Sequence, residues 1–188
     1  MSELLIAAYQ KNMDNSFFGL TNYTAATQQL LIEYGATGLH LTEHSRGTMT
    51  GGNARQTLYN TPGTAGMLSK TTVNNYGGAF NVYTADEQLA YLQNRASVTD
   101  PEQRANMVLK YQVHNNDPVG RWFFMGNNPG TGGVIPKDSN VFKELANVFT
   151  GATTVHSCYG SGASACARYW SNPSIPLLVP VTPRKEGD

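Results

Sequence analysis

The chain has 188 residues, of which 40% are hydrophobic and 14% charged, and its thirteen basic and thirteen acidic side chains cancel. A disordered segment needs high net charge and few apolar residues, so this composition excludes one. The chain also lacks the basic surplus with which nucleic-acid-binding proteins neutralise phosphates, so no nucleic-acid partner is expected. No apolar run is long enough for a transmembrane segment, and we expect the acidic start Met1–Ile6 not to be a signal peptide. The chain is predicted to form one globular domain over residues 1–188.

Helical and strand patterns alternate along the chain. Apolar residues at three- and four-residue steps predict helices over 3–13 and 21–34. A short strand is predicted over 37–42 and leads at once into a helix over 45–58. Further strands are predicted over 71–76, 107–113 and 153–155, and further helices over 85–95, 141–149 and 163–170. This alternation predicts an α/β fold with a small, mainly parallel sheet flanked by helices, in which ligands bind beyond the carboxyl ends of the strands.

The segment Leu39–Thr50 passes from a predicted strand into a predicted helix, with Ser45 at the junction and Gly47 two residues later. This is the arrangement of a nucleophile elbow, in which a strained turn projects a serine hydroxyl above the sheet edge. The helix N-terminus and the backbone amide of Arg46 would then stabilise an oxyanion. Glu43 stands where the G-x-S-x-G motif has its first glycine. The alternative is that Ser45 only caps an ordinary helix.

A serine nucleophile needs a base and an acid, which follow it in the order Asp, then His, in α/β-hydrolases. Asp117 comes after the predicted strand over 107–113, and Pro118 ends that strand. His156 follows the predicted strand over 153–155. The three candidates therefore fall in the expected order, each after a strand. Alternatively, Asp117 forms an Asx-turn before proline and His156 is a surface-loop histidine.

Two further residues are candidates for the walls of a pocket. His44 is the neighbour of Ser45. Trp122 opens the segment 121–130, which joins an apolar block to a glycine-containing loop. That segment is either a core element followed by a turn or a lid over an apolar acyl pocket.

A competing class is a metal-independent ribonuclease that uses two histidines and a lysine. His40, His44, His114 and Lys110 supply these residue types, but no spacing singles them out. His40 is expected within a strand, and His114 is expected to be structural. The neutral charge balance also argues against this class.

Cys158 and Cys166 are the two cysteines of the chain. They are either unrelated thiols or a disulfide that closes a small loop, which would require an oxidising compartment. Their spacing and number exclude a cysteine metal site. No metal or cofactor is expected.

The segments 44–50, 116–119 and 156–159 resemble the lipase-like α/β-hydrolase domain. More closely, the elbow with its continuation over 51–54, and the tail over 156–166, resemble the C-terminal region of large two-partner-secretion filamentous haemagglutinins. Those are proteins of contact-dependent growth inhibition, which carry a toxin at the C-terminal tip. The resemblance extends from about Thr37 to Cys166.

This resemblance implies a secreted effector, part of a larger exported protein, that enters a neighbouring bacterium and is neutralised by a cognate immunity protein. Such toxin tips are exchanged freely and many are nucleases, so the chemistry depends on the triad argument. We expect a serine hydrolase of lipase or esterase type that acts on an acyl ester or a lipid. The alternatives are a toxin nuclease and a non-catalytic adhesin or entry module. Only about forty residues precede Ser45, so the sheet is minimal, the N-terminus is truncated or the catalytic machinery is incomplete.

Overall fold

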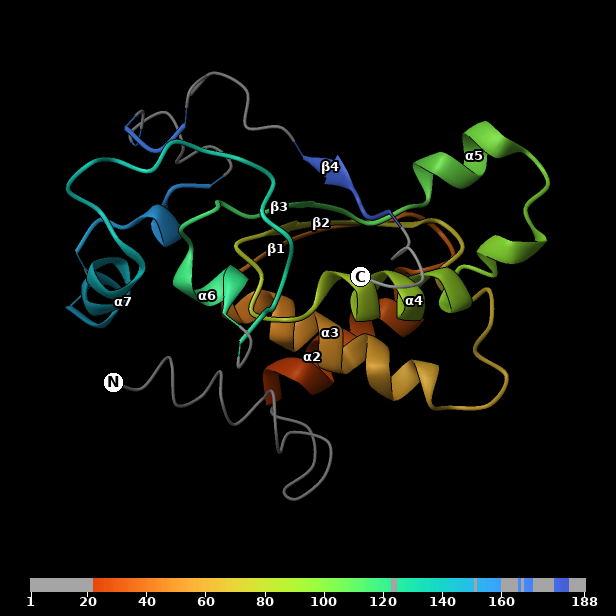
Figure 1. Ribbon diagram of the computed structural model, residues 1–188. Helices are drawn as coiled ribbons and strands as arrows, with labels where there is room; N and C mark the ends of the chain where they lie inside the picture. Colours follow the sequence, from red (N-terminus) through yellow and green to blue (C-terminus); the bar gives the residue numbers. More distant parts are fainter. Residues whose placement is uncertain are drawn as a thin grey trace.

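A computed structural model describes residues 22–122, 125–150, 152–159, 166, 168–170 and 178–182. In this part of the chain, four strands form one sheet in the order β1-β2-β3-β4 (Figure 1). They are β1 (Leu39–His44), β2 (Thr71–Tyr76), β3 (Lys110–Gln112) and β4 (Val179–Pro180). The first three are parallel, and β4 is antiparallel to β3. The prediction of an α/β fold with a mainly parallel sheet is confirmed.

Helices connect the parallel strands. Figure 1 shows α2 (Asn22–Tyr34), α3 (Arg46–Tyr59) and α4 (Val82–Leu92) on one face of the sheet, with α2 packed beside α3. The shorter helices α5 (Pro101–Asn106) and α6 (Pro118–Arg121) lie before and after β3. The helix α7 (Val141–Thr150) and the 3-10 helix η2 (Val155–Ser157) follow. A second 3-10 helix, η1 (Arg95–Ser97), follows α4.

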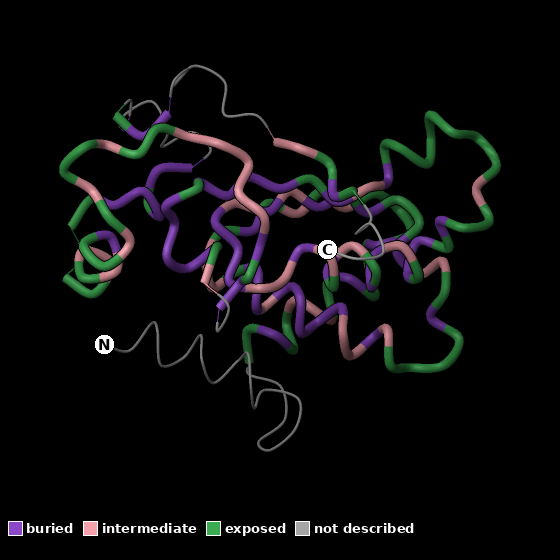
Figure 2. The backbone as a smooth tube through the Cα atoms, in the orientation of Figure 1, coloured by how far each residue is buried: buried purple, intermediate pink, exposed green. Residues whose placement is uncertain are grey.

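The main core lies between the sheet and these helices. Alternate strand residues, such as Leu41, Val73 and Tyr111, face the helices and pack with residues such as Leu58 and Leu89, as expected for a side-chain period of two. Figure 2 shows that burial is concentrated in the sheet and the helices against it, whereas α5 and the loops around it are exposed.

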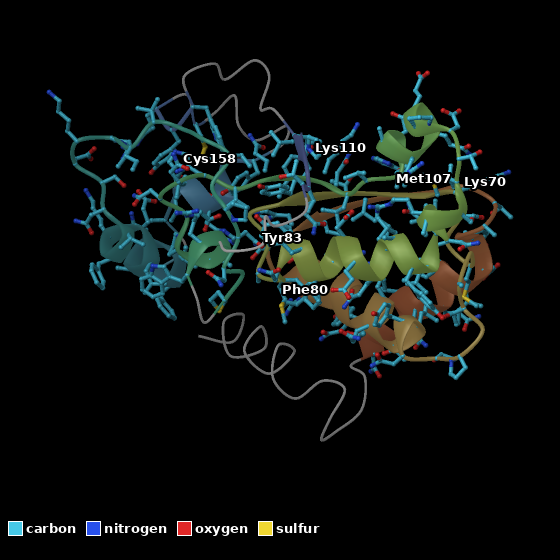
Figure 3. All side chains as sticks on the ribbon, turned by 45° about the vertical axis from the view of Figure 1, so that its right-hand side comes forward. Lys70, Phe80, Tyr83, Met107, Lys110 and Cys158 are labelled. Atoms are coloured by element: carbon cyan, nitrogen blue, oxygen red, sulfur yellow. A yellow bond between two sulfur atoms is a disulfide. The ribbon has the colours of Figure 1, made fainter. Side chains whose placement is uncertain are left out.

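The carboxyl ends of the three parallel strands meet at one edge of the sheet. The register pairs His44 with Tyr76, and Tyr76 with Gln112. Figure 3 labels Lys70 and Met107, which precede β2 and β3, at one end of the molecule and Cys158 at the other. Segments that follow the strands therefore gather on the side where Cys158 lies.

Some predicted elements were wrong. The predicted strand over 153–155 is not a strand, because Thr154 caps η2 through a capping box with Ser157. The predicted strand over 107–113 is shorter, since its first residues follow α5, a helix capped by Asp100 that was not predicted. The predicted strand over 37–42 lies two residues further along, as β1. The predicted helix over 3–13, and much of that over 163–170, lies outside the described residues.

Candidate active site

Ser45 occupies a one-residue turn between β1 and α3. Its backbone angles are φ 52° and ψ −121°, a positive φ that non-glycine residues rarely adopt. The Ser45 N–H donates to the carbonyl of Tyr76 at 3.1 Å, and Thr48 donates its hydroxyl to the Ser45 carbonyl at 2.6 Å. The Ser45 side chain makes no capping hydrogen bond to α3. Its geometry is that of an elbow rather than that of a helix cap.

The structure brings Ser45, His156 and Asp117 into one hydrogen-bonded chain. Ser45 Oγ lies 2.7 Å from His156 Nε2, and His156 Nδ1 lies 3.0 Å from both carboxylate oxygens of Asp117. A carboxylate only accepts hydrogen bonds, so Nδ1 carries the imidazole proton and Nε2 is the atom that accepts from the serine hydroxyl. Asp117 is fully buried, and His156 is 7% exposed. This is the geometry of a nucleophile, a base and an orienting acid.

Asp117 is fixed by the start of α6. It is the N-cap of that helix, with Pro118 as the first helical residue, and its Oδ1 accepts from the amides of Val119 at 2.8 Å and Gly120 at 3.1 Å. Burial acts to raise the pKa of Asp117, but His156 and the hydrogen bonds from His156, Tyr159 and Gly120 outweigh it and lower the pKa. Asp117 therefore stays ionised beside His156.

The segment that carries His156 is held on both sides. Before it, the N–H of Val155 donates to Oε2 of the buried Glu144 at 2.9 Å. After it, Cys158 forms a disulfide with Cys166, with Cα atoms 5.6 Å apart. Trp170 also donates its indole N–H to the Cys158 carbonyl at 2.7 Å. Of the two readings of the cysteines, the structure has the disulfide.

His44 lies against the base. Its Nε2 donates to the carbonyl of His156 at 2.8 Å, and the two rings stack with centroids 5.1 Å apart. Burial, and then the charge of His156, lower the pKa of His44. The lowered pKa favours the neutral form of His44, which supports His156 through this hydrogen bond.

Trp122 lies against α7. Its ring packs edge-on against Phe142 of α7, with centroids 6.1 Å apart. Farther along the same segment, Met125 is buried in a cluster with Met49 and Val119, and the side chain of Asn128 donates to the Gly78 carbonyl at 2.7 Å. Met125 and Asn128 are therefore buried parts of this segment.

Sequence reasoning missed two residues that touch the triad. Tyr159 is buried, donates its hydroxyl to Asp117 Oδ2 at 2.6 Å and accepts from the His114 N–H at 2.8 Å. Burial and the Asp117 charge raise its pKa well above the ordinary value. Gly77, directly after β2, has φ 53°, and a Cβ there would lie 3.0 Å from Asp117 Oδ2 and 3.2 Å from His156 Cε1. The sequence signal that could have identified Gly77 is a glycine directly after a predicted strand.

The carboxylate of Glu43, which stands where the motif has its first glycine, is directed toward α3. Its buried carboxylate receives Arg55 of α3 at 2.7 and 3.0 Å. A Cβ on Gly51 of α3 would lie 1.8 Å from Glu43 Oε1. Close packing of β1 against α3 therefore depends on Gly51, a glycine of the helix, and not on a glycine at position 43.

The remaining histidines do not form a catalytic pair in the described residues. His114 is fully buried, its Nε2 lies 2.9 Å from the Tyr169 carbonyl, and its Nδ1 accepts from the N–H of Asn116 at 3.0 Å. Both of its nitrogens are engaged, as expected for a structural histidine. His40 is exposed on the outer sheet face, where it and Lys110 line a hollow of about 280 Å³.

Comparisons of the chain with protein-family models, curated proteins and solved structures gave no significant match. Among the described residues, no helix is both long and apolar enough to cross a membrane, and no group of three or more His, Cys, Asp or Glu side chains could hold a metal ion. The geometry of Ser45, His156 and Asp117 is therefore the main guide to the chemistry.

Proposed function

We propose that this chain is a serine hydrolase of lipase or esterase type with an α/β-hydrolase-like site. The observation that carries the proposal is the hydrogen-bonded chain from Ser45 Oγ through His156 to Asp117. It is supported by the strained backbone of Ser45, because strain of this kind is concentrated at functional sites.

In the proposed reaction, Ser45 Oγ attacks the carbonyl carbon of an acyl ester. His156 Nε2 takes the serine proton and then gives it to the leaving alkoxide as the C–O bond breaks. Water then attacks the acyl-serine and gives its proton to the same nitrogen. As the bond between the acyl carbon and Ser45 Oγ breaks, His156 returns that proton to Oγ and the carboxylic acid is released. Asp117, kept ionised by its lowered pKa, orients the imidazole and stabilises its charged form.

The oxyanion would be stabilised at the start of α3. Arg46 is the first residue of that helix, so its backbone N–H belongs to the end that carries partial positive charge. One preorganised donor of this kind contributes about 3 kcal/mol to transition-state stabilisation.

We further propose that the domain is an interbacterial toxin, exported as the C-terminal part of a larger protein and neutralised by a cognate immunity protein. Its resemblance to contact-dependent growth inhibition proteins supports this. The Cys158–Cys166 disulfide supports it as well, because disulfides persist in oxidising compartments such as the extracellular space and the periplasm.

Replacing Ser45 with alanine tests the hydrolase. The purified chain should hydrolyse p-nitrophenyl acetate, and Ser45→Ala should reduce the rate by at least about a thousandfold because the nucleophile is lost. Ser69→Ala is the matched control, since Ser69 is exposed and precedes β2 at the far end of the sheet. It should retain the full rate.

The same variants separate the hydrolase from its alternatives. Toxicity in target cells should disappear with Ser45→Ala and persist with Ser69→Ala. Toxicity that survives Ser45→Ala and is accompanied by RNA or DNA degradation would contradict the hydrolase in favour of a nuclease. Equal, undiminished ester hydrolysis by both variants would also contradict it.

A further inference from the structure

A groove of about 420 Å³ lies beside the elbow. Its walls are α2, the strand β1 and the start of α3, and its lining includes His44, Arg46 and Gly47 around Ser45. Figure 1 shows α2 and α3 side by side below the sheet. Because β1 is an edge strand among the described strands, the groove follows the edge of the sheet to His44 and Arg46, the residues on either side of Ser45.

The wall formed by α2 and β1 is partly apolar. Its apolar side chains are Tyr23, Ala26 and Leu30 of α2 and Leu41 of β1, and polar residues such as Thr27 and Thr42 line it as well. Tyr23 is 71% exposed and Leu30 is 48% exposed, so large apolar side chains line a hollow that is open to solvent. Covering such surface is favourable, and exposed apolar surface within a groove is typical of a ligand site.

The groove adds no unpaired carboxylate to this surface. Glu43 lines it, but its carboxylate is bound by both terminal nitrogens of Arg55. Tyr23 and Leu30 are two helical turns apart, which corresponds to roughly 11 Å along α2. The groove therefore extends along α2, carries apolar side chains from α2 and β1, and ends among the residues that flank Ser45 in the chain.

We propose that this groove binds the acyl chain of the substrate, an unbranched chain of medium length whose carbonyl lies at Ser45. This inference rests on the proposed hydrolase function and adds its chain-length specificity. Ala26, Leu30 and Leu41 determine that specificity, because the methylenes of the chain lie against them.

The test compares the hydrolysis of p-nitrophenyl octanoate and p-nitrophenyl acetate. The wild type should have the higher kcat/KM with octanoate. Ala26→Trp places an indole in the groove, so the octanoate-to-acetate ratio of kcat/KM should fall by about tenfold or more. Ala25→Trp is the matched control, since Ala25 is exposed on the same helix and does not line the groove. Its ratio should equal that of the wild type.

Leu30→Ala is a second variant, which removes chain contact without adding bulk. It should also lower the ratio, and circular dichroism establishes that each variant is folded. An unchanged ratio in folded Ala26→Trp and Leu30→Ala would overturn the acyl groove while leaving the hydrolase intact. Absence of any ester hydrolysis by the wild type would instead overturn the proposed function and the groove with it.

Discussion

Asp117 shows how one side chain can fold a loop and serve a site at the same time. Its Oδ1 accepts two amide hydrogen bonds at the start of α6, while both oxygens face His156 Nδ1 and Oδ2 also accepts from Tyr159. The sequence allows an Asx-turn or a triad acid at Asp117, and in the structure both hydrogen-bond patterns occur together. The capping bonds hold the carboxylate in the orientation that the imidazole needs.

The lowered pKa of Asp117 predicts a specific dependence of stability on pH. A carboxylate with a lowered pKa contributes fully above the ordinary pKa of about 3.9 and loses that contribution as the pH falls toward the folded value. Asp117→Asn removes the titrating group, so its unfolding free energy should vary less with pH in this acidic range. Urea unfolding of both proteins between about pH 6 and about pH 3 measures this difference. Parallel curves would contradict it.

Ser45, Asp117 and His156 could be predicted from the sequence, because each follows a predicted strand and the three occur in the order expected for a hydrolase triad. Tyr159 and Gly77 were missed for a physical reason. Each matters through contacts with residues far away in the chain, such as the bond between Tyr159 and Asp117 across 42 positions. Only the folded arrangement shows that those contacts exist.

At the scale of elements, the Glu43–Arg55 pair ties the end of β1 to α3. The carboxylate and the guanidinium are both buried, at 7% and 0% exposure. Removing one partner of a buried pair leaves an uncompensated charge, whereas replacing both by apolar residues is often neutral. The pair therefore links the strand and the helix between which Ser45 lies.

Glu43→Gln should lower the unfolding free energy by about 3–5 kcal/mol, because Arg55 then remains buried without a counter-charge. The double variant Glu43→Met/Arg55→Met should recover most of this loss. Asp138→Asn is the control, since the Asp138–Lys143 pair is exposed and such pairs contribute about 1 kcal/mol or less. Urea unfolding measures all three. A loss in Glu43→Gln no larger than that of the control would show that the pair does not stabilise this junction.

The elements that the sequence predicted well have a strong local pattern. The strand predicted over 71–76 is β2, and the three- and four-residue spacing of apolar residues located α2. The prediction failed over 153–155, where β-branched residues suggested a strand but a capping box forms η2 instead. It also failed for β4, two residues long and defined by pairing with β3.

At the scale of the molecule, the site joins two packed regions. The main core lies between the sheet and the helices, while a second cluster surrounds the base. That cluster contains Val155, Cys158, Tyr159, Cys166, Tyr169 and Trp170. His156 lies within this second region, so its position relative to Ser45 depends on how firmly the cluster is held. The disulfide between Cys158 and Cys166 constrains the cluster covalently.

Reduction of the disulfide should therefore weaken the region around His156. Closing a loop of this length stabilises a fold by on the order of 2.5 kcal/mol, so reduced protein should unfold at a lower urea concentration. The Cys158→Ser/Cys166→Ser variant should behave like reduced wild type and be insensitive to reductant. Identical unfolding midpoints for oxidised and reduced wild type would show that the bond contributes nothing.

The central claim is that Ser45 is a nucleophile activated by His156. The most direct measurement treats the oxidised protein with a fluorophosphonate probe and locates the adduct by peptide mass spectrometry. We predict a single adduct on Ser45 that forms far more slowly in His156→Ala, because that variant lacks the base. An adduct on another residue, or no adduct on folded wild-type protein, would contradict the claim.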